Sequence, residues 1–176
     1  MSLENLLLQE KNPILKRWLY LIEGQLSADN VPHSRERDQF TNPEGYIALH
    51  EIDSIYEELL HELNTEKICR SLDSIIRIKA VQDIPPSQAI AFVFLLKQSI
   101  MEKLQAQIKK QQLLDEWLSF ETKIDMLASL AFNVYMHCRE KVNQLKMNEV
   151  KADRERAFRL LELVEAGGRK NIKATE

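Results

Sequence analysis

Glycine and proline are both scarce in this chain, with 4 and 5 residues respectively among 176. Sandwiches and barrels of short strands need many more turn residues, so the scarcity favours long helices. Long apolar runs are missing as well, because no stretch of about 18 consecutive apolar residues predicts a membrane span. The first residues also lack the basic start and apolar core of a secretory signal. From these absences we expect an all-α protein in the cytoplasm that does not bind a membrane.

Charge of one sign is not in excess either. The formal net charge is −3, which gives no electrostatic reason to expect nucleic acid as a partner. Two cysteines occur, Cys69 and Cys138, and neither has a Cys or His at metal-binding spacing. Both are expected to be reduced thiols, with a disulfide as the alternative. Cys138 precedes Arg139, whose charge would favour a thiolate, so Cys138 is a candidate redox-sensitive thiol; the simpler interpretation is a small buried apolar side chain.

The chain does contain clear helix starts and stops. Asn12-Pro13 and Asn42-Pro43 each place a capping side chain before a proline, whose missing N–H costs nothing in the first turn of a helix. Thr65 is expected to cap a further helix, and that helix must end near Asp83 because prolines follow. Residues 28–41 are polar and predict a loop. These signals predict a bundle of five to six helices, at 2–11, 13–27, 43–63, 65–83, 86–112 and about 116–166.

The last predicted helix is much longer than the others. Gly167 is expected to end it, since glycine is common just past a helix end. We therefore predict a single helical domain over residues 1–166 and a polar tail over 167–176. The apolar residues on the last two helices recur at intervals of three and four, which favours core-facing helices over a free-standing coiled coil. These stripes comprise Ala89, Phe92, Val93, Leu96, Ile100, Leu104 and Ile108, then Trp117, Phe120, Ile124, Leu127, Ala131, Val134, Cys138, Val142 and Leu145.

Residues that could carry chemistry are not arranged in any recognisable site. His50-Glu51 and His61-Glu62 lack the second histidine of a zinc-binding HExxH motif, and no glycine-rich phosphate loop or nucleophile elbow is present. We therefore predict no catalytic, cofactor-binding or metal-binding residues, and no enzyme. Several charged or polar residues near the apolar stripes form a candidate signalling or structural cluster, although each is also compatible with a helix edge that faces water. The candidates are Arg77, Gln82, Asp83, Asp125 and Arg139.

Three segments carry a resemblance to a known family. They are IIRIKAVQDIPPSQAIAFVFLLK at 75–97, KIDMLASLAFNVYMHCREKVNQLKMNEV at 123–150, and the shorter FTNPEGY at 40–46. Together they resemble the N-terminal sensory domain of RsbT co-antagonist proteins of the RsbR/RsbRD type. One departure is Asn133, where the family is expected to favour Asp.

The resemblance implies a globin-related helical domain without haem that serves in stressosome-type signalling. The absence of histidine between Thr65 and Met136, where a proximal haem ligand is expected, agrees with this. The resemblance also implies a homodimer through the last two long helices, a regulatory protein as partner, and a member that stands alone without an output domain. The competing hypothesis is a small-ligand or redox-sensing helical protein that uses a pocket near Cys138.

Overall fold

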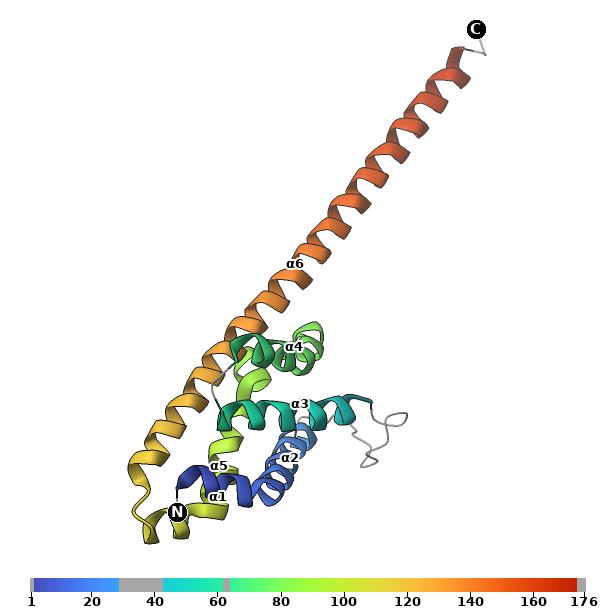
Figure 1. Ribbon diagram of the computed structural model, residues 1–176. Coiled ribbons are helices and arrows are strands. Elements are labelled where there is room, and N and C mark those ends of the chain that lie inside the picture. Colours follow the sequence, from blue (N-terminus) through green and yellow to red (C-terminus); the bar gives the residue numbers. More distant parts are fainter. Residues whose placement is uncertain (1, 29–42, 62–63, 174–176) are drawn as a thin grey trace. The chain divides into compact units, whose positions relative to one another are not determined.

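The computed structural model describes residues 2–28, 43–61 and 64–173, and the described residues form helices and short connections without a strand (Figure 1). The predicted all-α class is therefore confirmed. The chain divides into two compact units, Met1–Cys138 and Arg139–Glu176, which we describe separately. The helices are α1 (Leu3–Gln9), α2 (Lys11–Ala28), α3 (Pro43–Leu60), α4 (Thr65–Val81), α5 (Pro86–Lys110) and α6 (Leu114–Lys173).

Local capping explains several of these boundaries. The side chain of Ser2 accepts a hydrogen bond from the Asn5 N–H at 3.3 Å and so caps α1. In α4 the cap is Asn64 rather than the predicted Thr65, because the Asn64 side chain accepts from the Lys67 N–H at 3.1 Å and Thr65 is already helical. The loop predicted at 28–41 lies outside the described residues, except for Ala28, which ends α2.

Both α4 and α5 end in the same turn geometry. Asp83 (φ 64°), just past the end of α4, adopts the left-handed conformation, and the Ile84 N–H bonds back to the Lys79 carbonyl at 3.1 Å. Past the end of α5, Gln112 has φ 56° and the Leu113 N–H bonds to the Ile108 carbonyl at 3.0 Å. These are the bonds of the Schellman motif, which usually places glycine at the left-handed position. The scarcity of glycine therefore did not prevent tight helix ends.

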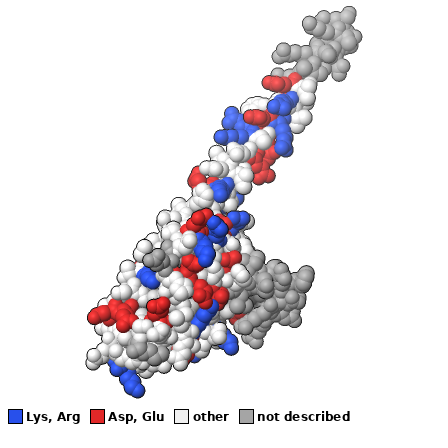
Figure 2. Space-filling view, in the orientation of Figure 1, with Lys and Arg blue, Asp and Glu red and all other residues white. Residues whose placement is uncertain are grey.

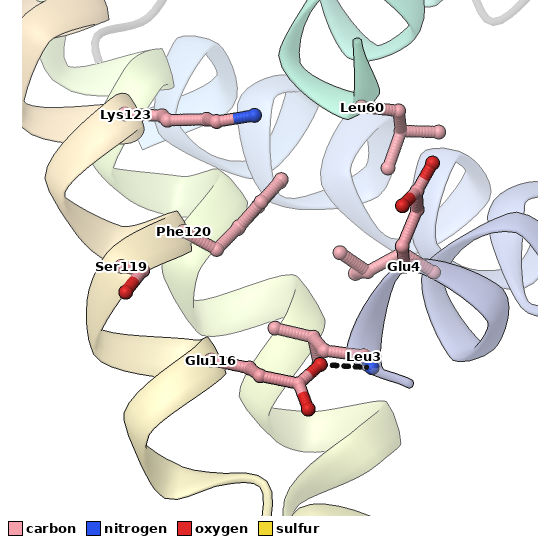
Figure 3. A pocket seen from close by; sticks show the side chains of 8 residues that line it. Leu3, Glu4, Leu60, Glu116, Ser119, Phe120 and Lys123 are labelled. Atoms are coloured by element: carbon pink, nitrogen blue, oxygen red, sulfur yellow. Dashed lines mark hydrogen bonds between the residues drawn. The ribbon is translucent and has the colours of Figure 1, made fainter. Parts of the chain in front are cut away.

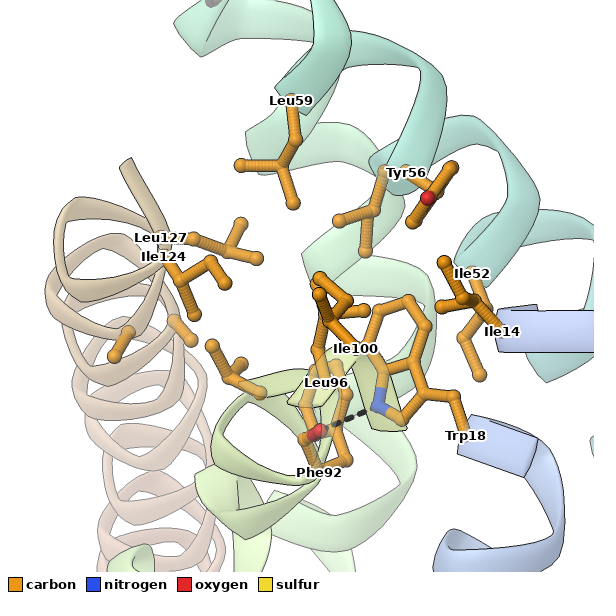
Figure 4. Packing of buried hydrophobic residues seen from close by; sticks show 14 of the residues in the cluster. Ile14, Trp18, Ile52, Tyr56, Leu59, Phe92, Leu96, Ile100, Ile124 and Leu127 are labelled. Carbon is orange, nitrogen blue, oxygen red and sulfur yellow. Dashed lines mark hydrogen bonds between the residues drawn. The ribbon is translucent and has the colours of Figure 1, made fainter. Parts of the chain in front are cut away.

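The core of the first unit surrounds Trp18. In Figure 4 its indole N–H donates to the Phe92 carbonyl, at 2.6 Å, and the two rings stack with centroids 6.5 Å apart. Helix α2 packs along α5, and α3 packs along α4. The predicted stripe of α5 is buried throughout. The fully buried side chains that fill this interior include Ile14, Trp18, Ile52, Tyr56, Leu59, Ile68, Leu72, Ile76, Phe92 and Leu96.

Ion pairs between helices border this core. Lys11 of α2 lies 2.9 Å from the Asp53 carboxylate and also pairs with Glu57, both on α3. Burial lowers the pKa of Lys11, but the hydrogen bonds to the two carboxylates outweigh it and leave that pKa above its usual value. Arg17 of α2 donates to Glu102 of α5 at 2.5 Å.

The second unit consists of the later part of α6. Most of its described large apolar side chains are exposed, including the predicted stripe residue Leu145, which is 69 % exposed, whereas Val142 is half-buried. Basic and acidic side chains alternate along this part of the helix (Figure 2). We predicted that Gly167 ends this helix, and this is wrong, because the helix continues to Lys173. A glycine inside a helix costs only about 1 kcal/mol relative to alanine, so its presence alone does not end one.

Candidate functional site

The first turns of α6 hold the start of α1. The Glu116 carboxylate accepts a hydrogen bond from the Leu3 backbone N–H at 2.7 Å, as Figure 3 shows. The first N–H groups of a helix have no partner within the helix, and its N-terminus is positively polarised. Glu116 therefore satisfies one such group and places a negative charge where it is favourable. Three buried leucines, Leu3, Leu6 and Leu7, anchor the same helix in the core.

Lys123, two turns further along α6, holds the end of α3. Its ammonium group donates to the carbonyls of Leu59 at 3.1 Å and His61 at 3.2 Å. The last carbonyls of a helix lack partners and carry the negative end of the helix dipole. Lys123 thus complements the end of α3 in the way that Glu116 complements the start of α1.

A third contact joins α6 to the turn between α4 and α5. The Tyr135 hydroxyl donates to the Ile84 carbonyl at 2.6 Å. Close to it in sequence, the Cys138 thiol donates to the Asp73 carboxylate of α4 at 3.4 Å. Glu116, Lys123 and Tyr135 therefore tie α6 to three other parts of the first unit, and we call them the three α6 caps.

A pocket of about 250 Å³ lies beside α1, where α6 and the end of α3 approach it (Figure 3). Its apolar lining consists of Leu3, Leu7, Leu60 and Phe120, each less than 8 % exposed. Its polar lining consists of Glu4, Glu116, Ser119 and Lys123. The pocket therefore combines buried apolar walls with two carboxylates and one ammonium group, and two of the α6 caps border it.

Apolar side chains also lie on the surface of the last two helices of the first unit. On α6, Leu118, Met126, Phe132 and Met136 are 51 %, 53 %, 44 % and 49 % exposed, and on α5 Phe94 is 47 % exposed. Residues 14 and 18 positions apart on a helix point in nearly the same direction, so Leu118, Phe132 and Met136 share a face. We call Leu118, Phe132 and Met136 the exposed apolar face; Met126 points about 80° away from Leu118, and Phe94 lies on the other helix.

Lys97 of α5 bridges two carboxylates of α6 near this face. Its ammonium lies 3.1 Å from Glu121 and 2.6 Å from Asp125. Burial lowers the pKa of Lys97, but the hydrogen bonds to Asp125 and Glu121 raise it by more. The lysine therefore stays charged and offsets part of the negative charge of the two carboxylates.

The residues predicted as a polar cluster have different surroundings. Arg77 is exposed and pairs with Asp73 on its own helix, whereas Asp125 is exposed and pairs with Lys97. Gln82 caps the end of α4 and Asp83 follows it in the left-handed turn, both exposed. Arg139 begins the second unit. The role of these residues in signalling stays a prediction.

Cys138, the predicted redox-sensitive thiol, is only 6 % exposed and Cys69 is half-buried; neither forms a disulfide. The described residues contain no group of three or more His, Cys, Asp or Glu side chains that could hold a metal ion. Among the same residues, no helix is both long and apolar enough to cross a membrane.

Sequence analysis missed the three α6 caps as functional positions. Glu116 and Lys123 are seven residues apart, a spacing that places both on one side of a helix. Nothing in the sequence, however, indicated that the ends of α1 and α3 would lie against that side.

Comparison with known proteins identifies the family of this chain. No curated protein and no solved structure matched it. The family model for the RsbT co-antagonist protein rsbRD N-terminal domain matches residues 16–150, which span most of α2 to α6 of the first unit and leave out α1. Domains of this family are non-haem, globin-like sensor modules of stressosome-type signalling. The family resemblance seen in the sequence is thereby confirmed, and the chain belongs to the family of RsbT co-antagonist rsbRD N-terminal domains.

Proposed function

We propose that this chain is a non-enzymatic sensory module that acts through homodimerisation and through contacts with a regulatory protein. The dimer would form through α5 and α6 of the first unit. The observation that supports this proposal is the exposed apolar face, because three large apolar side chains about half exposed on one side of α6 are more than a monomer needs.

A second copy suits this face for two reasons. Most soluble assemblies are symmetric homo-oligomers, and in a two-fold dimer the same patch serves both subunits. The charges beside the face are also largely compensated, since Lys97 pairs with both Glu121 and Asp125. An interface that covered these groups would not leave two unpaired carboxylates in a dry environment.

The test of this proposal is the mass of the protein in solution. Sedimentation velocity over a range of protein concentrations should give the mass of a dimer that dissociates on dilution. A monomer at every concentration, including the highest that stays soluble, would contradict the proposal.

The alternative of a redox sensor that uses Cys138 has less support. A reactive thiol needs access to its oxidant, and Cys138 is buried. Titration of the native protein with a thiol reagent tests this alternative: a fast-reacting Cys138 would restore it, and slow reaction until unfolding would argue against it.

A further inference from the structure

Helix α1 is bound to the rest of the first unit through one apolar side. Leu3, Leu6 and Leu7 occupy positions i, i+3 and i+4 and are almost fully buried. This spacing places the three side chains together, and it is the pattern with which an amphipathic helix of one protein binds an apolar surface of another. The other side of α1 is exposed and consists of Glu4, Asn5, Leu8 and Gln9.

The surface that receives α1 is formed by residues of α3 and α6. Leu60 and Phe120 are buried and border the pocket beside α1 (Figure 3). Tyr56 is buried as well, and its hydroxyl donates a hydrogen bond to the Leu7 carbonyl at 3.0 Å. We call Tyr56, Leu60, Glu116 and Phe120 the α1-binding site.

The hydrogen bonds between this site and α1 involve backbone groups of α1. Glu116 accepts from the Leu3 N–H in the first turn, and Tyr56 donates to the Leu7 carbonyl in the last turn. Every helix has such N–H and carbonyl groups without partners at its two ends. Another helix with apolar residues at the same three positions would therefore make the same contacts.

The occupant of the site is a short element that depends on it. Helix α1 has seven residues, whereas isolated helices shorter than about 12 residues are marginal in water. The family model matches residues 16–150, a range that contains the four residues of the α1-binding site but not α1. The site is thus part of the sensory domain, whereas α1 lies outside the matched residues.

We propose that the α1-binding site is a docking site for an amphipathic helix of the regulatory protein, and that this helix replaces α1. The partner helix carries apolar residues at positions i, i+3 and i+4, and its first N–H groups face Glu116. Because α1 belongs to the same chain, it competes at a high local concentration and keeps weaker helices out. The inference rests on the proposed contact with a regulatory protein, for which it names the surface.

The experiment measures, by fluorescence anisotropy, the binding of a labelled peptide with the sequence of residues 1–11 to the full-length chain. The Leu6→Glu variant should bind this peptide about tenfold more tightly than the wild type, because a buried charge keeps its own α1 out of the site. A peptide that itself carries Leu6→Glu should not bind. The matched control peptide carries Leu8→Glu at an exposed position and should bind within about threefold of the unchanged peptide.

Hydrogen exchange of the full-length chain tests the same site with a smaller change. Glu116→Gln replaces a charged acceptor by a neutral one, and charge-assisted hydrogen bonds are roughly twice as strong as neutral ones. The amides of α1 should therefore exchange about tenfold faster, while those of α5 keep their rate. Glu149→Gln, an exposed glutamate further along α6, is the matched control and should change neither rate.

Three results would overturn the assignment. They are no binding of the peptide to Leu6→Glu, equal binding to Leu6→Glu and the wild type, and equal exchange rates of α1 in Glu116→Gln and Glu149→Gln. Sedimentation of the same samples separates this inference from the proposed dimer. A dimer that binds no peptide overturns the docking site alone, whereas a monomer that binds the peptide overturns the proposed dimer alone.

Discussion

Replacing Phe132 with glutamate should dissociate the proposed dimer. Phe132 is 44 % exposed on α6 and points within about 40° of the direction shared by Leu118 and Met136. An aromatic side chain of about 200 Å² thus leaves about 90 Å² for a partner to cover. At about 25 cal/mol per Å², this area contributes about 2 kcal/mol in each subunit. Because the change occurs twice in a dimer, about 4 kcal/mol is lost, which corresponds to a dissociation constant about a thousandfold higher.

The assay is sedimentation velocity of the wild type and of Phe132→Glu across a dilution series. Leu8→Glu is the matched control, because Leu8 is also 44 % exposed but lies on α1. Both side chains are about half buried within the monomer, so the two substitutions should lower the free energy of unfolding by similar amounts, and comparing them isolates the effect on the dimer. An unchanged dimer in Phe132→Glu, or equal dissociation in Leu8→Glu, would refute the assignment of the interface to this face.

Three further predictions concern the stability of the fold. Gln112→Gly should raise the free energy of unfolding in urea by about 0.5 kcal/mol. The left-handed conformation costs a residue other than glycine about 1–2 kcal/mol, but glycine also increases the entropy of the unfolded chain, which cancels part of the gain. A lower urea midpoint would argue against this prediction. Lys123→Met should lower the free energy of unfolding by about 1–2 kcal/mol by leaving the end of α3 without its donor, whereas Lys103→Met, on the exposed surface of α5, should change it little. Burial raises the pKa of Tyr56 in the folded state, so above about pH 10 the unfolded chain loses a proton that the folded chain keeps, and stability falls with rising pH. The same titration of Tyr56→Phe should show a shallower fall, and an identical pH profile would count against this account.

The sequence predicted the helices well because their signals are local. The start at Pro43, the stop before Pro85 and the apolar stripe of α5 each depend on residues within a few positions, and the structure confirms them. The cap predicted at Asn12 is wrong, because α2 already begins at Lys11 and Asn12 lies inside it.

Where two local signals compete, the prediction was less accurate. Asn64 rather than Thr65 caps α4. Helix α6 continues through Gly167, because a single glycine destabilises a helix by only about 1 kcal/mol relative to alanine.

The candidate site was much less predictable. Glu116 contacts the start of α1, which lies 113 residues earlier in the chain, and Lys123 contacts the end of α3, which lies more than 60 residues earlier. A charged side chain on a helix ordinarily faces solvent. It acts as a cap only when the fold places the end of another helix against it, and the sequence does not indicate that placement. The exposed apolar face was not predicted, because none of its residues belongs to the predicted stripes and their exposure depends on which side of α6 faces the core.

The three α6 caps also restrict how α6 can move. From Glu116 to Tyr135 the helix rises by about 28 Å, and each cap contacts a different element at a different point along α6. A slide by a single residue, about 1.5 Å with a rotation of about 100°, would pull all three hydrogen bonds out of reach together. Such a slide would therefore break the contacts of α6 with α1, with the end of α3 and with the turn between α4 and α5 at the same time.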